Sequence, residues 1–249
     1  MALLEVVDVR KRFGGLQAVA GASLDVVPGE IVGLIGPNGA GKTTLFHLIS
    51  GFLTPDAGDV RLDGATTRGL KPHQVCRLGL ARTFQIVKPF QGLTVLENVR
   101  VGVLARTAAF AAATQKAREI LALVGLEHRA EHAARGLTLA DRKRLELARA
   151  LATEPRLLLL DEVMAGLTPT ETDRIIELCR AINVRGTAIL LIEHVMRAVM
   201  ALSRRIVVLN EGQVIATGPP DVIARAPQVV EAYLGEEYTG LAEGGHADA

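Results

Sequence analysis

The chain has 249 residues, with 28 basic and 27 acidic side chains, a formal net charge of +1 and 49% apolar residues. This balance excludes a disordered tail and a polycation that coats nucleic acid. The mean hydropathy of +0.29 would suit a membrane protein. However, apolar runs such as Leu157 to Leu160 and Ala188 to Ile192 are far shorter than the roughly 20 residues that span a bilayer. We therefore expect no membrane span.

Two cysteines, Cys76 and Cys179, are expected to stay reduced. The N-terminus shows no charged start followed by an apolar stretch and a cleavage site, so we expect an intracellular chain. Aromatic residues make up only 3% and Trp is absent, so the apolar excess is aliphatic. These features favour an α-rich or α/β core, built as one large domain or as a core with a small subdomain.

The first 35 residues alternate as strands do, with turns at Gly14-Gly15 and Pro28-Gly29. Residues 31 to 35 are apolar on both faces, which is typical of a central strand in a parallel sheet. A small hairpin is expected around residues 59 to 64. The stretch from about 92 to 152 is rich in Ala, Leu, Glu and Arg and predicts a helical insert.

Strand patterns return after this insert, with helical patterns between them. One helix is expected to begin at an N-cap Thr168, with Pro169 first and Glu171 completing a capping box, and to end at Gly186. Residues 210 to 212 predict a late hairpin turn, and residues 243 to 249 a frayed tail. Alternating strands and helices predict a parallel α/β sheet. The expected strands are residues 157–160, 188–192 and 206–209.

A complete phosphate-loop pattern, Gly-x4-Gly-Lys-Thr, occupies residues 36 to 43 between an apolar strand and a helix. Its glycines allow successive N–H groups to face a triphosphate, and the helix start adds a positive end. Lys42 is expected to reach the β- and γ-phosphate oxygens, and Thr43 to ligate Mg²⁺. A glycine-rich turn with an exposed Lys is the alternative, which this context disfavours. The nucleotide-binding residues predicted here are Gly36, Pro37, Asn38, Gly39, Ala40, Gly41, Lys42, Thr43 and Thr44.

Two carboxylates, Asp161 and Glu162, follow the apolar strand at residues 157 to 160. Ligands of open α/β sheets bind at the carboxyl ends of the strands, which places these side chains beside the phosphate loop. Asp161 is expected to hold Mg²⁺ through water, and Glu162 to take a proton from the attacking water. Alone, two acids after a strand would be an ordinary solvated edge; their pairing with Lys42 favours the catalytic interpretation.

In order along the chain, several segments resemble the motifs of ATP-binding-cassette (ABC) ATPases. The match implies an α/β P-loop NTPase core with an N-terminal antiparallel β subdomain and an α-helical signature subdomain. Other stretches narrow the resemblance to the ATP-binding subunits of branched-chain amino acid importers. The first set is residues 36–44, 82–85, 137–151, 161–162 and 192–194; the second is residues 12–16, 51–55, 81–85, 93–99 and 230–235.

The resemblance implies one ABC ATPase domain over residues 1–249. Residues 1–85 and 153–225 would form the nucleotide-binding core with its β subdomain, residues 86–152 the helical subdomain, and residues 226–249 a C-terminal helix and tail. It also implies roles for three residues outside the phosphate loop.

Those three residues are Phe13, Gln85 and His194. Phe13 would stack on adenine, although a Phe after a short strand is also often a core residue. Gln85 would reach Mg²⁺ and the attacking water, and His194 would bind the γ-phosphate and position that water.

The signature segment, Leu137-Thr138-Leu139-Ala140-Asp141, departs from the family, which usually has a Ser and two glycines here. Thr138 keeps a hydroxyl, Ala140 adds a methyl group where phosphate must come close, and Asp141 adds a negative charge or completes a capping box. Thr138 and Ala140 are still expected to contact nucleotide held by a second subunit. Val163 and Thr168 also depart from the usual Pro and Asp or Asn. Arg142, Lys143, Arg144 and Arg149 are polar positions of the following helix and offset the acid.

The expected function is ATP hydrolysis that energises import of a branched-chain amino acid or related small polar solute, with ATP and Mg²⁺ bound. The implied partners are two membrane permease subunits, a second ABC ATPase subunit and, indirectly, a solute-binding protein, at the cytoplasmic face of the inner membrane and without nucleic acid. An exposed apolar patch is expected near residues 85 to 99 for docking on the permease.

Three other functions compete with this one. A regulatory ATP-dependent clamp with weak hydrolysis is retained as an alternative function because the signature is altered. A kinase or GTPase is disfavoured because no guanine-reading Asn-Lys-x-Asp occurs, and a DNA-repair ATPase because no sustained heptads occur.

Overall fold

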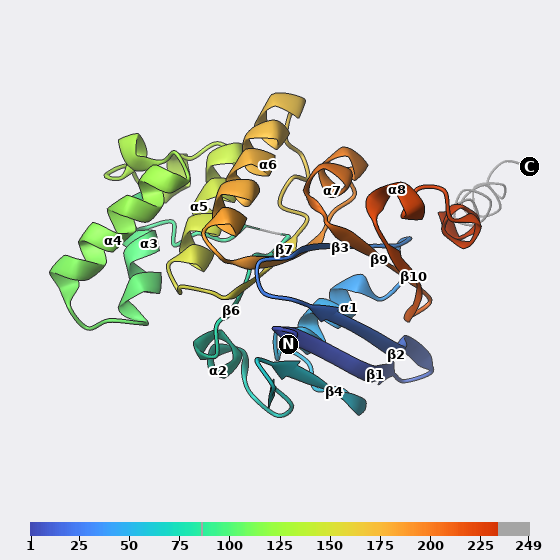
Figure 1. Ribbon diagram of the computed structural model, residues 1–249. Coiled ribbons are helices and arrows are strands. Elements are labelled where there is room, and N and C mark those ends of the chain that lie inside the picture. Colours follow the sequence, from blue (N-terminus) through green and yellow to red (C-terminus); the bar gives the residue numbers. More distant parts are fainter. Residues whose placement is uncertain (86, 234–249) are drawn as a thin grey trace, which may run out of the picture.

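The computed structural model describes residues 1–85 and 87–233. It consists of two sheets that lie together, with a group of helices to one side (Figure 1). No helix in these two described stretches is long and apolar enough to span a bilayer. Residues 234–249 lie outside the described residues, and they include the predicted tail at 243 to 249 and the end of the 230–235 motif. Residues 227 to 233 are helical.

The first sheet is antiparallel, with strand order β2-β1-β4-β5. Phe13 pairs with Leu16 across the predicted glycine turn, so that turn is confirmed. Val6 lies opposite Leu24 on one side and Val60 on the other, and all three are buried on the same face. This sheet comprises β1 (Leu4–Phe13), β2 (Leu16–Val26), β4 (Ala57–Leu62) and β5 (Ala65–Thr66).

The second sheet has strand order β10-β9-β3-β8-β7-β6 and is parallel except for β10, which is antiparallel to β9. The strand predictions at residues 31–35, 157–160, 188–192 and 206–209 are confirmed, as is the late hairpin turn. Every residue of β3, β7 and β8 is buried, because both faces of this sheet are covered. Its strands are β3 (Ile31–Ile35), β6 (Leu80–Arg82), β7 (Leu157–Asp161), β8 (Ala188–Ile192), β9 (Arg205–Asn210) and β10 (Gln213–Gly218).

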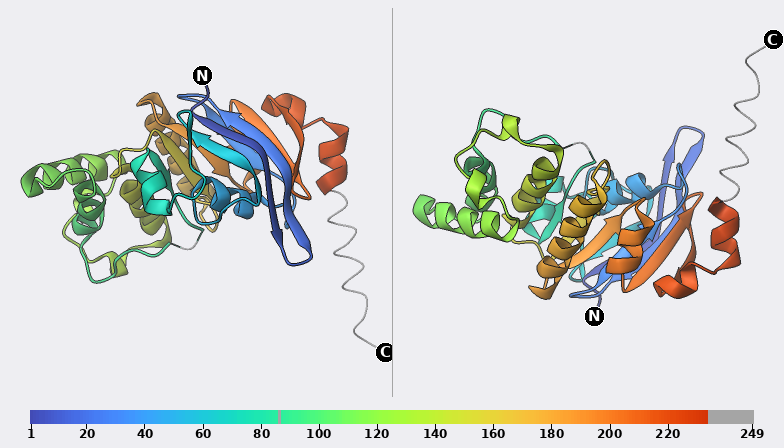
Figure 2. Two further views of the ribbon diagram at one scale, coloured as in Figure 1. Left: turned by 90° about the horizontal axis from the view of Figure 1, so that it is seen from below. Right: turned by 90° about the horizontal axis from the view of Figure 1, so that it is seen from above.

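Successive side chains along each parallel strand point to opposite faces of the sheet, so they pack into two different hydrophobic clusters. On one face, Leu34 and Leu159 share a cluster with Phe46 of α1 and with the antiparallel sheet. On the other face, Leu160 clusters with Ile175 of α6. Figure 2 shows the orange helices over this second face in the view from above. The helices outside the insert are α1 (Lys42–Ile49), α2 (Pro72–Arg77), α6 (Pro169–Val184), α7 (Met196–Leu202) and α8 (Pro220–Ile223).

The predicted helical insert is confirmed and lies to one side of the sheets (Figure 1). Val99, Leu121 and Leu145, one from each of its three α-helices, are fully buried in the same cluster. The predicted start of α6 is also confirmed, since the Thr168 hydroxyl accepts a hydrogen bond from the Glu171 N–H. The insert contains α3 (Val95–Leu104), α4 (Phe110–Leu123), η1 (Glu127–Arg129), η2 (Ala134–Gly136) and α5 (Leu139–Leu151).

Gly102 of α3 faces the end of α5. A Cβ atom at Gly102 would lie 2.7 Å from the Cβ of Ala152 and 3.0 Å from the Arg149 carbonyl oxygen. Substitution by alanine therefore forces the two helices apart. This contact holds the insert's helices at a fixed separation.

Gly102→Ala is expected to destabilise the protein by roughly 1–2 kcal/mol, because overpacking outweighs the better helix propensity of alanine. Thermal unfolding measures the effect as a lower Tm. Gly136→Ala is the matched control in the same part of the chain, since no heavy atom lies within 4 Å of a Cβ there. An unchanged Tm for Gly102→Ala would contradict the close packing of α3 on α5.

Candidate active site

The phosphate-loop residues connect the end of β3 to the start of α1. Gly36 and Gly41 have φ angles of 152° and 100°, which L side chains rarely adopt. A Cβ at Gly36 would lie 1.9 Å from the Leu209 carbonyl oxygen, and one at Gly41 would lie 2.3 Å from the Ala18 carbonyl oxygen. Only glycine fits these two positions, so the loop is pressed between β9 and β2.

Lys42 opens α1 and is buried, with 7% of its surface exposed. Its Nζ atom donates to the carbonyl oxygens of Gly36 and Pro37, at 2.6 and 2.8 Å. The ammonium group therefore lies within its own loop. Asn38 and Thr43 are exposed beside it, so the loop also presents polar groups to the outside.

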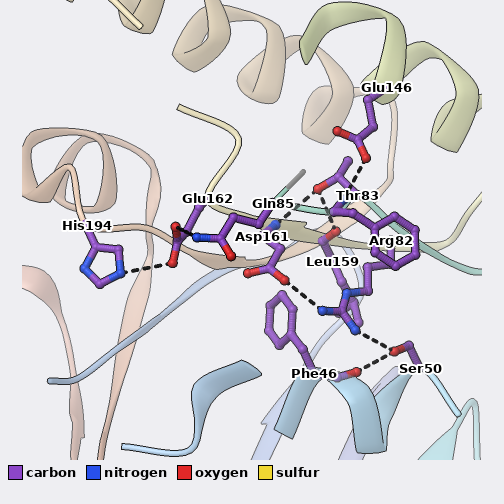
Figure 3. Close-up of polar contacts among 11 residues, drawn as sticks. Phe46, Ser50, Arg82, Thr83, Gln85, Glu146, Leu159, Asp161, Glu162 and His194 are labelled. Carbon is purple, nitrogen blue, oxygen red and sulfur yellow. Dashed lines mark hydrogen bonds and ion pairs between the residues drawn. The ribbon is translucent and has the colours of Figure 1, made fainter. Parts of the chain in front are cut away.

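The ends of β6, β7 and β8 bring three predicted catalytic residues together (Figure 3). The Gln85 amide donates to Glu162 Oε2 over 2.7 Å, and His194 Nε2 lies 3.1 Å from Glu162 Oε1. Both neighbours thus contact the same carboxylate. The parallel register, in which Asp161 lies opposite Ile192, produces this arrangement because it ends both strands at one edge.

Glu162 has a left-handed backbone, with a φ of 50°. This conformation is uncommon for a residue with a side chain and is found at functional sites where the surrounding structure enforces it. Its N–H donates to the Ile192 carbonyl oxygen over 2.9 Å, which holds the turn against β8. The backbone thereby aims the carboxylate toward Gln85 and His194.

Asp161 ends β7 and is buried. Its Oδ2 accepts a hydrogen bond from Arg82 Nη2 over 2.7 Å, and its N–H donates to the Thr83 hydroxyl. A cavity of about 760 Å³ is lined by Thr43, Gln85 and Asp161 among others. Their hydroxyl, amide and carboxylate oxygens are the donors that Mg²⁺ prefers, so the residues present fit that ion.

Phe13 lies at the end of β1 and is 45% exposed, so it is not a core residue. Lys11 Nζ lies 5.7 Å from the centre of its ring. An aromatic ring with this exposure is available for stacking. The structure places Thr138 and Ala140 at the start of α5, in the helical insert. The other predicted nucleotide contacts lie on β1, on β7, on α1 and in the loop that precedes α1.

Thr138 caps α5, because its hydroxyl accepts a hydrogen bond from the Asp141 N–H over 3.2 Å. The predicted capping box is only half formed. The Asp141 carboxylate pairs with Arg144 one turn along the helix instead of returning to Thr138. This pairing offsets the negative charge in the signature segment, as the sequence predicted. Ala140 is buried, and Leu139 is 46% exposed.

The signature helix also contributes two buried charged residues that the sequence did not single out for the site. Lys143 is 3% exposed, and its Nζ donates to the carbonyl oxygens of Glu162 and Gln85, at 3.0 and 3.4 Å. Glu146 Oε1 accepts a hydrogen bond from the Phe84 N–H over 2.8 Å. Helix α5 therefore makes hydrogen bonds to the backbone of Phe84, Gln85 and Glu162 around the predicted catalytic centre. The sequence carries no local signal for this burial, because charged side chains on a helix usually indicate a solvated face.

Two buried carboxyl groups near this centre have raised pKa values. Burial raises the pKa of Glu146 to about 6, and its Oε2 atom has no hydrogen-bond partner among the described residues. Burial likewise raises the pKa of Glu193 to about 7, although its Oε1 accepts a hydrogen bond from the Met164 N–H. Glu146 contacts the backbone of Phe84, and Glu193 directly precedes His194, but neither is a predicted site residue.

Comparison with known proteins agrees with this geometry. Residues 19–165 match the family model described as "ABC transporter", and residues 213–239 match "Branched-chain amino acid ATP-binding cassette transporter". The chain belongs to the ABC transporter family, whose ATP-binding subunits bind nucleotide and hydrolyse ATP to power transport. The α/β fold expected from the sequence is confirmed.

Two curated relatives and two solved structures show how far the likeness extends. The chain is 43% identical to the high-affinity branched-chain amino acid transport ATP-binding protein LivG of Escherichia coli strain K12, over 94% of this chain and 98% of that protein. It is 42% identical, with the same coverage, to the corresponding protein BraF of Pseudomonas aeruginosa. An ATP-binding cassette in its ADP conformation superposes with a TM-score of 0.86 at 31% identity, and a nucleotide-free cassette with 0.85 at 30%. Each covers 94% of this chain and 99% of the other.

Glu146→Gln is expected to change the pH dependence of stability. The pKa in the fold, about 6, lies above the ordinary value of 4.5. The stabilisation from the bound proton is therefore fully present below pH 4.5 and is lost as the pH rises through about 6. Glutamine resembles the protonated form and does not titrate, so the Tm of the variant minus that of the natural protein should increase up to about pH 7. The full change corresponds to about 2 kcal/mol. A difference that is constant from pH 4.5 to 8 would contradict the burial of this charge.

Proposed function

We propose that the chain is the ATP-hydrolysing subunit of an importer for branched-chain amino acids or a related small polar solute. The convergence of Gln85 and His194 on Glu162 is the observation that carries the hydrolytic part. The narrower solute class is supported by the names of the relatives and by the family model matched at residues 213–239.

Hydrolysis requires positioning more than covalent chemistry from the protein. The phosphate loop, residues 36–44, binds the triphosphate through backbone N–H groups and the start of α1, and Lys42 turns from its own carbonyls to the phosphates. A water oxygen attacks the γ-phosphorus while the bond to the β–γ bridging oxygen breaks and ADP leaves. Glu162 accepts the proton of that water, and Gln85 and His194 hold the water in line.

Thr43, Gln85 and Asp161 are the residues that would hold Mg²⁺, with Asp161 acting through water. The bound ion supplies charge neutralisation at the phosphates. Phe13 would stack on the adenine ring, which its exposed position at the end of β1 permits.

The second half of each ATP site would come from another ATPase subunit. Two subunits would enclose two ATP molecules, with Thr138, Ala140 and the N-terminal end of α5 reaching the γ-phosphate held by the partner. Asp141 would oppose this phosphate by charge, and its ion pair with Arg144 reduces that repulsion. The altered signature therefore keeps the features that an anion site needs.

Of the two permease subunits, one would dock on this chain, at the rim of the cavity between the core and the insert. Phe84 and Phe90 are 42% and 45% exposed at this end of the insert, and Arg149 stacks on Phe90 at 4.6 Å. The patch expected at residues 85–99 is narrower than predicted, because Val95 and Val99 of α3 are buried against other helices. An aromatic and basic surface is the remaining docking area.

We propose the same division of the chain as above: one ABC ATPase domain with a nucleotide-binding core at residues 1–85 and 153–225. Residues 86–152 would form its helical subdomain and residues 226–249 its C-terminal segment. Residues 227–233 of that segment are helical, and residues 234–249 lie outside the described residues. Such a subunit acts as a peripheral protein at the cytoplasmic face of the inner membrane. A solute-binding protein contributes indirectly and no nucleic acid is bound.

A regulatory clamp that binds ATP and dimerises with weak hydrolysis is the second candidate. It is favoured by one observation, the exposed Leu139 side chain where the family usually has glycine in the signature segment. The two candidates differ in turnover and share nucleotide binding. Phosphate release therefore separates them.

Glu162→Gln is expected to keep ATP affinity within about twofold and to lower steady-state turnover by at least about a hundredfold, because the amide cannot accept the proton of water. A phosphate-release assay with the assembled transporter measures turnover, and fluorescence of a labelled nucleotide measures binding. Glu177→Gln, at an exposed carboxylate on α6, is the control and should hydrolyse ATP normally. Undiminished turnover in Glu162→Gln would remove Glu162 from the mechanism.

A further inference from the structure

The ion pair between Arg82 and Asp161 is unusually well buried. The Arg82 side chain is 4% exposed and that of Asp161 is 5% exposed. Of the ion pairs among residues 1–85 and 87–233, it alone has both side chains below one-tenth exposure. A buried carboxylate needs a compensating cation, because loss of hydration destabilises its charge.

The surroundings of Arg82 fix the guanidinium group in place (Figure 3). Its central carbon lies 5.6, 5.9 and 5.3 Å from the ring centres of Phe46, Phe52 and Phe84. Nη1 reaches the Ser50 hydroxyl over 3.3 Å. Three rings and a hydroxyl therefore hold one cation in position to donate to Asp161.

The same carboxylate is the proposed ligand of hydrated Mg²⁺. A monovalent cation within hydrogen-bond distance of Asp161 and a divalent ion near it repel each other, and the low exposure of the pair reduces the screening by water. Arg82 also neutralises the charge that would otherwise attract the metal. The two cations thus act against each other at one anion.

We propose that Arg82 is the counter-ion that holds Asp161 at the sheet edge before nucleotide binds, and that its charge weakens Mg²⁺ binding. Arg82 is then a positioning residue that sets the Mg²⁺ concentration at which the subunit binds its nucleotide. This inference rests on the proposed function, since it assumes that Mg²⁺ accompanies the nucleotide at Asp161.

The test compares Arg82→Met with the natural full-length chain. Methionine keeps much of the volume among the three phenyl rings and removes the charge. ADP binding is titrated with MgCl₂ by calorimetry, and the half-saturating Mg²⁺ concentration is expected to fall by about tenfold. Thermal unfolding in EDTA is expected to give a lower Tm than the natural chain, because Asp161 is left buried without its cation. Mg²⁺ and ADP together should recover most of that loss.

Three further variants separate charge from packing. Arg82→Gln also removes the charge and supplies the same titration if Arg82→Met does not fold. Arg82→Lys keeps the charge and should retain the natural Mg²⁺ requirement. Arg156→Gln breaks the exposed ion pair with Asp63, outside the site, and should change neither the Mg²⁺ requirement nor its recovery of stability.

An unchanged or raised Mg²⁺ requirement in both charge-free variants would overturn the inference and leave the proposed function intact. A lowered requirement in Arg82→Lys as well would also overturn it, because the effect would then follow packing and not charge. A natural chain that binds ADP equally well in MgCl₂ and in EDTA would overturn the proposed metal site together with the inference.

Discussion

The parallel pairing of β6, β7 and β8 is the constraint on which the rest of the site depends. It places the ends of three strands at one edge of the sheet. Leu80, two residues before Arg82, pairs with Leu157, and Asp161 lies opposite Ile192. Gln85 and His194, which lie 77 and 32 positions from Glu162 in the sequence, thereby reach its two carboxylate oxygens. Burial of both sheet faces holds this register, because a shift by one residue would exchange the two hydrophobic layers.

Charged side chains lie at the sheet edge where the apolar strands end. Arg82 reaches it from β6, and Lys143 and Glu146 reach it from the signature helix, so the insert and the core share hydrogen bonds at the proposed catalytic centre. A partner that moved α5 would therefore act on the segment around Gln85 and on the Glu162 backbone at once. The same helix carries the signature segment at its start, which connects the proposed contact with a second subunit to the centre in its own chain.

Much of the fold and part of the site could be predicted from the sequence. The glycine spacing of the phosphate loop, the apolar strands and the two acids after residue 160 are local patterns with direct physical meanings. Arg82, Lys143 and Glu146 could not be assigned in this way, since each makes its contact with a residue at least 19 positions away. Charged side chains on a helix usually indicate a solvated face, and only tertiary packing shows that Lys143 is buried. The Asp141–Arg144 pair is the opposite case, because its spacing of three residues is visible in the sequence.

The converging side chains of Glu162, Gln85 and His194 are proposed to support the ATP hydrolysis that drives a permease. The decisive measurement is the rate of Mg²⁺-dependent phosphate release by the purified chain, alone and after assembly with its permease subunits and partner ATPase in lipid vesicles. We expect sustained turnover that increases on assembly and with transported solute. Stable ATP binding and dimerisation without phosphate release in the assembled transporter would contradict it and favour the regulatory clamp.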